Sequence, residues 1–386
     1  MTSGLRIAIL THSTNPRGGV VHALELGDAL SRLGHQATVF APDPTGTGFF
    51  RDTVCATSCV AASRVGGSVR AMVETRVAEY VRHFEAADHR RFDIWHAQDG
   101  ISANALAMLK QRGLIAGFAR TVHHVDTFAD EQLGVLQMRG IKAADQLLVV
   151  ARVWRDWLAS ELGREACNVG NGVDCNRYAP APDATDGELR ARLGLPPGVP
   201  VFLAVGGIEE RKNTVRLLQA FQILRLQQPS CRLVIAGGAS LLDHDAYRAR
   251  FAGVLAHSGA SAAAVIRTGP VRQKFMPALY RAATALVFPS TREGFGLAVL
   301  EAMASGVPVV TSRIAPFTEY LGADDVLWCD PLDAASIASA MARSLDDACR
   351  MGLIGRGLRI AARHDWNDTA RAHLAVYERL RERAHA

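Results

Sequence analysis

The stretch ALVFPSTREGFGLAVLEAMASGVPVV, at residues 285–310, decides the fold class of this chain. Its first four residues and residues 308–311 are largely apolar runs of the kind that form buried strands. Between them, two glycines indicate a tight turn, and a helix is predicted to begin near Gly296. A strand, a turn, a helix and a second strand make a βαβ unit, whose strands lie parallel in one sheet.

The same alternation extends outward from this stretch. Other short apolar runs predict strands at 6–10, 36–41, 94–97, 119–122, 146–150, 201–205, 232–236, 265–267 and 326–329. Helical spacing of apolar residues predicts helices over 20–33 and 69–84, and a last helix over 367–383. Residues 175–200 hold five prolines and predict a linker with one short helix near 187–193. At 386 residues, the chain is expected to form two α/β domains with parallel sheets.

The composition excludes several other classes of protein. The chain is 49% hydrophobic and 21% charged, and its net charge of +5 is not clustered as nucleic-acid binding requires. Its seven cysteines form no Cys-x-x-Cys pair. No apolar run reaches the roughly 18 residues of a spanning helix. With an amino terminus that runs straight into a strand, these features predict a cytoplasmic protein that holds reduced thiols and no metal.

Two further patterns carry less weight. The Asp-His-Asp sequence at 243–245 looks like a metal motif, but it lies where a helix is predicted to start, and Asp is a common capping residue there. We therefore expect no metal site at it. Arginines recur at six-residue intervals as Arg64, Arg70, Arg76 and Arg82, which is not one helical face. A solvated surface is favoured for them, and peripheral membrane contact stays open.

A pair of cations, Arg211 and Lys212, follows the strand at 201–205 and is predicted to open a helix. Two positive charges at a helix N-terminus oppose the helix dipole, so they cost stability unless an anion offsets them. A diphosphate would do so, because Arg can bind it bidentately and Lys acts as a point charge. A solvated pair neutralised by Glu209 and Glu210 is the alternative interpretation, and the anion site is favoured.

Two carboxylates, Glu293 and Glu301, bracket the turn and the first half of the helix in the opening stretch. The backbone amides of Gly294, Phe295 and Gly296 can face a phosphate or sugar hydroxyls there. Carboxylates also accept hydrogen bonds from vicinal hydroxyls, such as those of a ribose. Eight residues of helix correspond to a rotation of about 80°, so the two carboxylates can reach different parts of one ligand.

Two loops of the first half also carry candidate ligand contacts. Gly18 and Gly19 lie between the first strand and its helix, where glycines let the backbone approach an anion. An ordinary tight turn is an equally good interpretation of that pair. His123 and His124 follow the strand at 119–122, and ligands lie at the carboxyl ends of parallel strands. One of the two histidines is expected at the ligand, and periodicity does not say which.

Together these residues resemble glycosyltransferase family 4, the retaining enzymes of the GT-B fold, over nearly the whole chain. The most specific match is the Glu-x7-Glu motif, which runs from Glu293 to Glu301 within a longer similar stretch. The family's basic pair matches Arg211 and Lys212, and its opening is similar to the double glycine. Its inter-domain signature is similar to Asn-Gly-Val-Asp at 171–174.

The resemblance implies two Rossmann-like domains facing across a cleft. Residues 1–175, with a returning helix at 367–386, would form the acceptor-side domain, and residues 176–366 the donor-binding domain. The implied activity is transfer of a hexosyl group from a nucleoside-diphosphate sugar to a hydroxyl acceptor, an EC 2.4 reaction. The family retains the anomeric configuration, generally without metal, and no cofactor is expected. The base and sugar of the donor and the identity of the acceptor stay open.

The resemblance also implies roles for individual residues. Glu301 would bind the donor ribose, and Glu293 would hold the transferred sugar. The basic pair would stabilise the departing diphosphate, and His123 would line the reacting centre. The expected catalytic residues are His123, Arg211, Lys212 and Glu293. The expected donor-binding residues are Gly18, Gly19, Asn171, Gly207, Gly294, Phe295, Gly296, Leu297 and Glu301.

The chain departs from the family at two points, and other functions stay open. The usual Gly-Arg after the first strand of the second domain is Gly206-Gly207 here, and His123 is followed by His124. A nucleotide-sugar epimerase and a non-catalytic nucleotide-sugar binding protein are the nearest alternatives. A phosphorylase would need a lysine-bound pyridoxal phosphate, and no lysine lies in a convincing motif for it. A dinucleotide oxidoreductase is disfavoured because its glycine fingerprint is absent.

Overall fold

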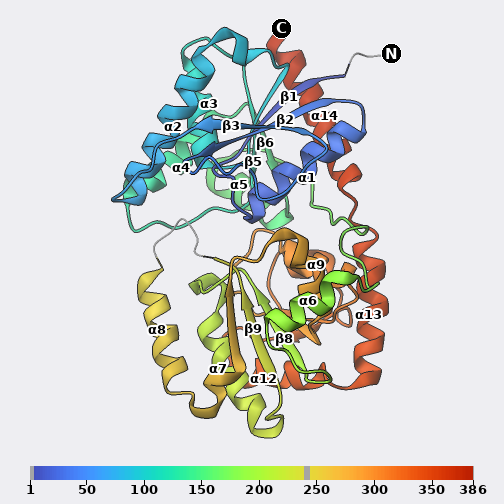
Figure 1. Cartoon of the computed structure of the whole chain (residues 1–386). Helices are drawn as coiled ribbons and strands as arrows, with labels where there is room; N and C mark the ends of the chain where they lie inside the picture. Colours follow the sequence, from blue (N-terminus) through green and yellow to red (C-terminus); the bar gives the residue numbers. More distant parts are fainter. Residues whose placement is uncertain (1–3, 239–243, 386) are drawn as a thin grey trace. The chain divides into compact units, whose positions relative to one another are not determined.

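The computed structural model describes residues 4–238 and 244–385, and the chain divides into two compact units (Figure 1). Unit 1 comprises Met1–Asn171 and Trp366–Ala386, and unit 2 comprises Gly172–Asp365. The boundaries predicted from the sequence lie at 175–176 and 366–367. Each unit has its own parallel sheet, which confirms the expected fold class of two Rossmann-like α/β domains.

Unit 1 is built on a seven-stranded parallel sheet in the order β3-β2-β1-β4-β5-β6-β7. The strands are β1 (Arg6–Leu10), β2 (Gln36–Asp43), β3 (Ala56–Ala61), β4 (Ile94–Ala97), β5 (Ala119–Val122), β6 (Gln146–Val149) and β7 (Cys167–Asn168). The five predicted strands are present. The two edge strands β3 and β7 were missed, because β3 is mostly exposed and β7 spans two residues, so neither has a buried apolar run.

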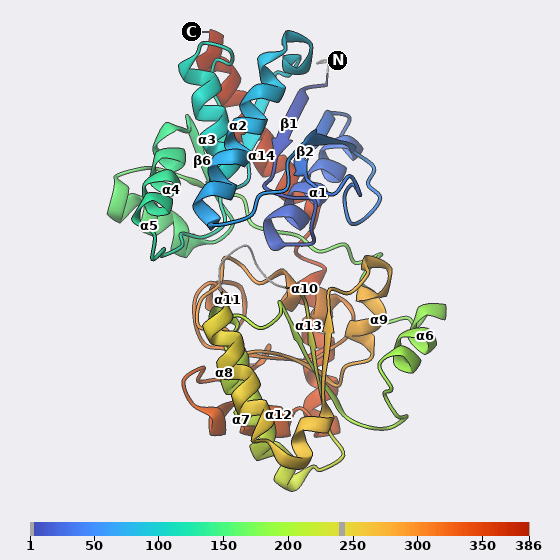
Figure 2. The same ribbon diagram turned by 60° about the vertical axis from the view of Figure 1, so that its left-hand side comes forward.

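Helices cover the sheet of unit 1 in two layers. They are α1 (Gly18–Arg32), α2 (Val69–Glu85), α3 (Gly100–Gln111), α4 (Glu131–Ala143), α5 (Arg152–Leu162) and α14 (Trp366–His385), with a short 3₁₀ turn at Ala87–Arg90. Helices α2, α3 and α4 pack side by side (Figure 2). The last helix, α14, packs beside α1 and against β4 (Figure 1). The predicted final helix therefore returns to the unit that the amino terminus begins.

Unit 2 is built on a six-stranded parallel sheet in the order β10-β9-β8-β11-β12-β13. The strands are β8 (Val201–Val205), β9 (Arg232–Ala236), β10 (Val265–Gly269), β11 (Ala285–Phe288), β12 (Val309–Ser312) and β13 (Leu327–Cys329). All six lie where the sequence predicts them, within two residues at either end. Five of them are almost continuously buried, which explains the success because buried parallel strands read as apolar runs, while the edge strand β10 is partly exposed.

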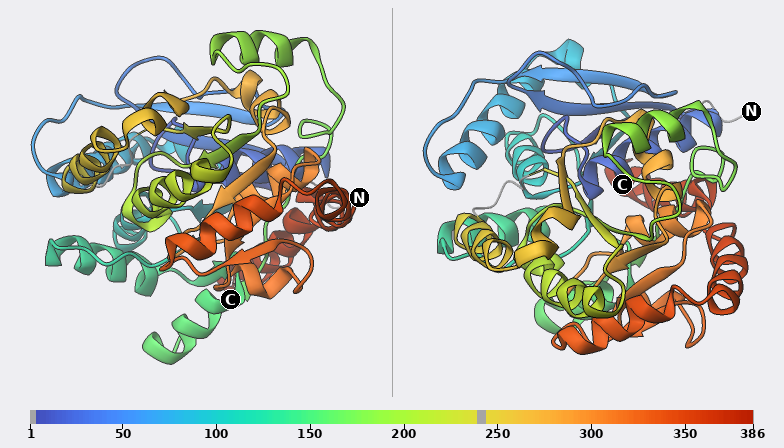
Figure 3. Two further views of the ribbon diagram at one scale, coloured as in Figure 1. Left: turned by 90° about the horizontal axis from the view of Figure 1, so that it is seen from below. Right: turned by 60° about the horizontal axis from the view of Figure 1, so that its bottom comes forward.

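The helices of unit 2 are α6 (Ala184–Arg192), α7 (Thr214–Gln227), α8 (Asp245–Ala256), α9 (Met276–Arg281), α10 (Leu297–Ala304), α11 (Phe317–Tyr320), α12 (Ala334–Arg343) and α13 (Asp347–Ala361), with 3₁₀ turns at Glu210–Lys212, Gly259–Ala264 and Gln273–Phe275. Helices α7, α8, α12 and α13 contribute to one large apolar cluster against this sheet. Helices α7 and α12 lie side by side (Figure 3). Phe221 of α7 and Ile337 of α12 belong to the core with Phe202 and Val287 of the sheet.

The strand order of each sheet reverses at one point. In unit 1 this switch point lies between β1 and β4, and in unit 2 between β8 and β11. Ligands of open parallel sheets bind outside the carboxyl ends of the strands at such a point. The chain there leaves β4 at Gln98, β8 toward Arg211 and Lys212, and β11 toward Glu293. The sheet order therefore places most of the predicted chemistry at the two switch points.

Three surface expectations have different outcomes. Arg76 was expected to be solvated, but it is buried in α2, where Glu79 and the carbonyl of Ser63 bind its guanidinium. The Asp-His-Asp sequence lies partly outside the described residues, and α8 begins at its last residue, Asp245. In the part of the chain that the structure describes, no helix combines the length and apolar character needed to cross a bilayer.

Candidate functional site

The switch point of unit 2 gathers two cations and a carboxylate from two loops. Lys212 Nζ lies 2.6 Å from Glu293 Oε1, and Arg211 Nη1 lies 3.3 Å from both oxygens of the same carboxylate. Arg211 Nε also lies 3.4 Å from Glu209, and Lys212 Nζ lies 4.1 Å from the ring centroid of Phe288. Glu293 and Lys212 are largely buried, while the Arg211 side chain is 36% exposed. The cluster is therefore closed behind the carboxylate and open at the arginine.

Glycines at the ends of β8 and β9 make room for this cluster. Gly206 and Gly207 have φ angles of 122° and 78°, a region that favours glycine. A Cβ on Gly206 would lie 2.7 Å from Lys212 Cε, and one on Gly207 would lie 2.6 Å from the carbonyl oxygen of Gly238. A side chain at either position would displace the lysine or the loop after β9. The backbone conformation and the close neighbours at these two positions thus explain why this chain has Gly-Gly where the family pattern has Gly-Arg.

The two cations do not open an α-helix, so that prediction was wrong. They end the 3₁₀ turn Glu210–Lys212, and α7 begins at Thr214. Asn213 separates turn from helix with a left-handed φ of 58°. Its Nδ2 donates to the carbonyl oxygens of Pro289 and Pro331, at 3.1 and 2.6 Å, which holds that conformation. The positive charges are therefore balanced by Glu293 rather than opposed by the end of a helix.

Burial and charge together shift the pKa values of the cluster. Burial lowers the pKa of Lys212 to about 8, although the carboxylate of Glu293 opposes the change. Burial by itself would raise the pKa of Glu293, but the attraction of Lys212 and Arg211 outweighs it and leaves the pKa below its ordinary value. An anion bound by Arg211 and Lys212 would favour the charged lysine further. The cluster is thus suited to a ligand that carries phosphate.

The turn between β11 and α10 holds the amides that were expected at the ligand. Gly296 caps α10 with a φ of 96°, so the turn requires a glycine there. Phe295 is buried, and its ring stacks on Tyr320 with centroids 4.9 Å apart and planes 6° from parallel. Gly294 precedes it, and Leu297 is the first residue of α10. The stacked ring fixes the backbone of this turn, so its amide groups are held in one orientation.

Glu301 lies on α10 and is held by a tyrosine from another helix. The hydroxyl of Tyr280, on α9, donates a hydrogen bond to Glu301 Oε2 at 2.6 Å. Tyr280 is fully buried and packs edge-on against Tyr178, with ring centroids 5.7 Å apart. Burial raises the pKa of Tyr280, so its hydroxyl stays protonated and donates. Glu301 therefore keeps one carboxylate oxygen bound to the protein.

The switch point of unit 1 places His123 against α1 and β4. His123 Nε2 lies 2.9 Å from Gln98 Oε1, and a Cβ on Gly19 would lie 3.5 Å from the His123 ring. The ring of His22 meets it edge-on at a centroid distance of 4.8 Å. His22 Nδ1 in turn bonds Asn171 Oδ1 at 2.6 Å. Gln98, Gly19 and His22 thus surround His123, and Asn171 extends these contacts through His22.

The double glycine lies inside helix α1, not in the loop before it. Gly18 and Gly19 are its first two residues, and neither has a positive φ. The first amides of a helix have no intrahelical acceptor, and no side chain of the N-cap residue Arg17 binds them. Gly19 leaves ordinary contact distance to His123. The pair therefore supplies amides without an intrahelical acceptor and leaves space beside His123, and the interpretation as a tight turn is wrong.

The second histidine of the pair has a different environment. His124 Nε2 lies 3.1 Å from Asp126 Oδ2, and its side chain is 38% exposed. It makes no contact with Gly19 that would match the contact of His123. Sequence periodicity did not choose between the two residues. In the structure, His123 is the one that lies beside the double glycine.

Four histidines of unit 1 form one group, in which His22, His96 and His373 are fully buried and His123 is partly exposed. Burial lowers the pKa of His22 to about 4 and that of His373 to about 3. Burial also lowers the pKa values of His96 and His123 well below the ordinary value. All four rings are therefore neutral at pH 7. Within residues 4–238 and 244–385, no group of three or more His, Cys, Asp or Glu has metal-binding geometry.

Two contributors to the site were not singled out from the sequence. Gln98 directly follows β4, the strand next to β1, and position after a predicted strand was the available signal. Tyr280 lies on a six-residue helix, too short for a clear period, and no local pattern pointed to Glu301. Both residues act on a partner more than 20 residues away in the chain. Such pairs become visible only when the order of the strands is known.

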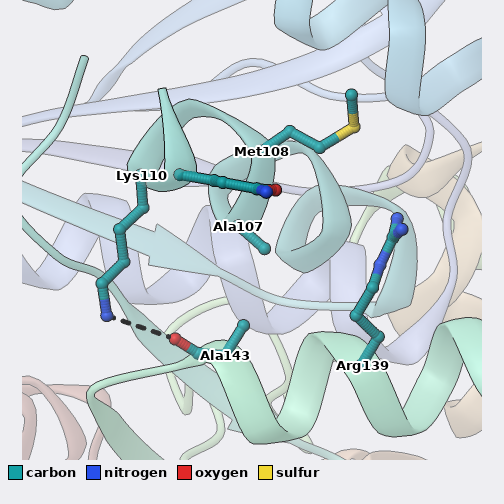
Figure 4. A pocket seen from close by; sticks show the side chains of 6 residues that line it. Ala107, Met108, Lys110, Arg139 and Ala143 are labelled. Carbon is teal, nitrogen blue, oxygen red and sulfur yellow. Dashed lines mark hydrogen bonds between the residues drawn. The ribbon is translucent and has the colours of Figure 1, made fainter. Parts of the chain in front are cut away.

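A separate hollow of about 420 Å³ lies between α3 and α4, away from the strand ends (Figure 4). Ala107, Met108 and Ala143 give it an apolar wall, and Lys110 and Arg139 border it. Lys110 Nζ already bonds Asp145 Oδ1 at 2.5 Å, and Arg139 Nε bonds Asn104 Oδ1 at 2.5 Å. Both cations are thus engaged by the protein, and none of the predicted residues lines this hollow.

Two family models match the chain, each over somewhat less than half of it and together over most of its length. The model described as Glycosyltransferase Family 4 matches residues 16–177, and the model described as Glycosyl transferases group 1 matches residues 186–372. The matched ranges contain every predicted catalytic residue. The chain therefore belongs to the family 4 glycosyltransferases, as the resemblance implied.

Named relatives match the chain to different extents. The O-antigen chain mannosyltransferase B of Escherichia coli is 35% identical over 46% of this chain and 45% of its own length. The first curated relatives are matched over about half of their length in this way. The phosphatidyl-myo-inositol mannosyltransferase of Mycolicibacterium smegmatis is 27% identical, over 96% of this chain and 92% of its own.

Solved structures share the fold over almost the entire chain. Sucrose-phosphate synthase from Thermosynechococcus elongatus has a TM-score of 0.81 and 22% identity, over 97% of this chain and 99% of that one. Anabaena HepE, solved in complex with UDP-glucose, has a TM-score of 0.75 and 18% identity over the same shares. At these identities the likeness concerns the fold alone, and it supports the GT-B architecture expected from the sequence.

Proposed function

We propose that the protein transfers a hexosyl group from a nucleoside-diphosphate sugar to a hydroxyl acceptor, with retention of the anomeric configuration. The observation that carries this proposal is the cluster of Arg211, Lys212 and Glu293 at the switch point of unit 2. Two cations beside a carboxylate, in a site open at the arginine, match a ligand that has both a diphosphate and sugar hydroxyls. The relatives named as mannosyltransferases support a hexose as the transferred group.

In the proposed reaction, the bond between the anomeric carbon and the diphosphate oxygen breaks, and a bond to the acceptor oxygen forms on the same face of the sugar. The acceptor's proton passes to the departing phosphate. Negative charge grows on that phosphate, and Arg211 and Lys212 stabilise it where it develops. These two cations supply the positive charge that a divalent metal supplies elsewhere, so we propose a metal-independent reaction. Turnover that persists in excess chelator is the expected result.

The remaining site residues have proposed roles along the donor. Glu301, held at one oxygen by Tyr280, would accept hydrogen bonds from the ribose hydroxyls. The amides of Phe295 and Gly296 would bind the transferred sugar together with Glu293. Because one neighbour was solved with UDP-glucose, UDP is the first nucleotide to test. The relatives named as mannosyltransferases keep nucleotides with other bases in the panel.

Thermal shifts with nucleotides test the donor site. UDP, GDP, ADP and their sugars would be added to the wild type and to Glu301→Ala. A ligand that binds only the native state raises the melting temperature in relation to its concentration over Kd. We expect a shift for one nucleotide, lost in Glu301→Ala and kept in the matched control Glu188→Ala, which changes a half-exposed carboxylate of α6. No shift with any nucleotide for a folded wild type would contradict the donor site.

Product analysis separates transfer from the remaining alternatives. An epimerase would convert the donor sugar while leaving it attached to the nucleotide, and a sensor would bind donor without turnover. We expect release of the nucleoside diphosphate that requires Lys212, together with a product whose anomeric proton shows the configuration of the donor. A product of inverted configuration would contradict the retaining reaction, and conversion without nucleotide release would favour the epimerase.

A further inference from the structure

We propose that Gln98 is a positioning residue that fixes the protonation pattern and the ring plane of His123. It would hold His123 as the tautomer with hydrogen on Nε2 and leave Nδ1 as an acceptor. We call the set of contacts that holds His123 in this way the clamp. It would extend from Gln98 through His96 to Tyr377 on the last helix, α14. The consequence for catalysis rests on the proposed function, but the tautomer itself can be observed without any turnover.

The contacts form one chain from the last helix to His123. His123 Nε2 lies 2.9 Å from Gln98 Oε1, and Gln98 Nε2 lies 3.3 and 3.4 Å from the two ring nitrogens of His96. His96 Nδ1 bonds the Tyr377 hydroxyl at 2.7 Å, and its Nε2 bonds Thr121 Oγ1 at 2.8 Å. Both nitrogens of His96 therefore have a hydroxyl partner, and its ring is held on two sides.

The orientation of the Gln98 amide decides the tautomer of His123. An amide oxygen only accepts hydrogen bonds, whereas an amide nitrogen only donates. The oxygen of Gln98 faces His123, so the nitrogen that it meets, Nε2, has to carry the hydrogen. A neutral imidazole has one donor nitrogen and one acceptor nitrogen. Nδ1 of His123 is then an acceptor, suited to a ligand hydroxyl that donates its hydrogen.

The fold holds Gln98 firmly enough for this task. The whole residue is only 2% exposed, and its backbone N–H donates a hydrogen bond to the backbone carbonyl of Leu10 on β1 at 2.9 Å. Gln98 directly follows β4 and His123 directly follows β5, and these strands are neighbours in the sheet. The two side chains are thus placed by adjacent strand ends. Neither depends on a long loop for its position.

The surroundings of His123 contain other histidines rather than acids. The groups that face it are His22 on α1, His96 on β4, His373 on α14 and the adjacent His124. Burial is the largest cause that lowers the pKa of His123, and these four rings lower it further. The ring is therefore neutral at pH 7, the state in which the choice of tautomer matters. Gln98 is the group that bonds its Nε2.

Nitrogen-15 NMR of histidine-labelled protein tests this directly. Long-range proton–nitrogen spectra distinguish a protonated ring nitrogen from an unprotonated one, and His123→Asn assigns the signals. We expect the wild type at pH 7 to show hydrogen on Nε2 of His123. In Gln98→Met, which keeps length but removes the acceptor, we expect both tautomers to be populated. Hydrogen on Nδ1 in the wild type, or an unchanged spectrum in Gln98→Met, would overturn the proposal.

Gln98→Glu provides a second variant of nearly the same shape. A carboxylate beside the ring favours the charged imidazole, so the pKa of His123 should rise toward neutral pH in this variant. The matched control is Gln137→Met, another largely buried glutamine, which bonds the backbone of Asp126. We expect that control to lose stability while the His123 signals stay unchanged. A His123 pKa that is the same in Gln98→Glu and the wild type would contradict the clamp.

Kinetics then link the clamp to the proposed function. One lost hydrogen bond of ordinary strength predicts a fall in kcat/KM of about tenfold for Gln98→Met. Gln98→Glu should add a pH dependence near neutrality that the wild type lacks. If the NMR results hold and no glycosyl transfer is found in any variant, the clamp stands and the proposed function fails. If transfer is present and unaffected by both Gln98 variants, the clamp has no catalytic role.

Discussion

The two switch points of this molecule use opposite means to prepare a polar site. In unit 2, the carboxylate of Glu293 is held between Arg211 and Lys212, so the groups are charged and close together. In unit 1, the partly exposed His123 is held by the neutral amide of Gln98 beside three buried neutral histidines. Both sites lie where the strand order of a parallel sheet reverses. The same topology therefore supports a charged site in one unit and an uncharged one in the other.

The difference matches two different chemical tasks. Buried charges need partners, and Glu293 is the partner that holds the two cations; in the proposed function an anionic ligand would share them. A neutral histidine instead offers one donor and one acceptor, which suits recognition of hydroxyls without attracting a second phosphate. In the proposed reaction, unit 2 would stabilise the charge that leaves and unit 1 would orient uncharged oxygen atoms.

The largest expected effect comes from removing a charge in unit 2. Lys212→Gln should lower kcat about 10²–10³-fold, because a group that stabilises charge in the transition state is lost. The measurement is the rate of nucleoside-diphosphate release with saturating donor. Lys274→Gln is the matched control, since that lysine is 54% exposed and lies 4.0 Å from Glu188. A fall in kcat of less than tenfold for Lys212→Gln would contradict the proposed role of Lys212 in stabilising the transition state.

The next effect is a loss of folding stability at acidic pH, and we expect it to arise from buried histidines of unit 1. The pKa of His373 is about 3 in the folded chain and about 6.5 in an unfolded one. Below pH 6.5 the unfolded state therefore takes up a proton that the folded state refuses, so stability falls as the pH falls. At pH 5 this costs about 2 kcal/mol relative to pH 8. His22, with a pKa of about 4, should cost a similar amount.

Denaturant titrations at pH 8 and pH 5 measure this effect. Tryptophan fluorescence reports mainly on unit 1, which holds Trp95, Trp154, Trp157 and Trp366. His373→Gln should reduce the loss of stability between the two pH values by about 2 kcal/mol. His257→Gln, an exposed histidine of unit 2, should leave it unchanged. An equal acid response in wild type and His373→Gln would mean that His373 is not the buried neutral base described here.

A third, smaller effect concerns nucleotide affinity at alkaline pH, and it depends on Lys212 in unit 2. The pKa of Lys212 is lowered by burial to about 8 in the nucleotide-free protein, and bound phosphate should raise it. Nucleotide affinity should therefore fall as the pH rises above 8, by about tenfold between pH 7.5 and 9.5. Calorimetric titration in buffers of different ionisation enthalpy would also show proton uptake on binding. Lys212→Arg should flatten the profile, and a wild-type profile that is already flat would contradict the assignment.

The sequence allowed the fold to be predicted well in unit 2 and less completely in unit 1. Five strands of unit 2 are largely buried apolar runs, and the partly exposed β10 begins with two apolar residues, whereas β3 and β7 of unit 1 are edge strands without such a run. Arg76 was misjudged for a related reason. A charged side chain normally indicates solvent, but Glu79 and the carbonyl of Ser63 neutralise and bond it in the interior. That pairing depends on a fold that periodicity does not reveal.

The candidate site divides in the same way. Glu293, Glu301 and the basic pair could be singled out because they lie in specific motifs, in the segments that follow β8 and β11. Gln98 and Tyr280 were not, because each acts through a residue on another element. The helix start at Thr214 was also missed, since the left-handed Asn213 is held by carbonyls of Pro289 and Pro331, far along the chain. Partners across the fold, rather than residue types, are what the sequence leaves undetermined.

The smallest expected effect would sharpen the comparison at Glu301. Tyr280→Phe removes the hydroxyl that binds Glu301 Oε2 but keeps the buried ring, so folding should be preserved. Without that hydrogen bond one carboxylate oxygen is held less firmly, and nucleotide affinity should fall by about threefold, as expected for loss of one modest hydrogen bond. Because the carboxylate is proposed to bind ribose, the preference for UDP over 2′-deoxy-UDP should shrink as well. Measured dissociation constants for both nucleotides decide this: an unchanged preference, with weaker binding of both, would mean that Tyr280 supports the helix and does not orient Glu301.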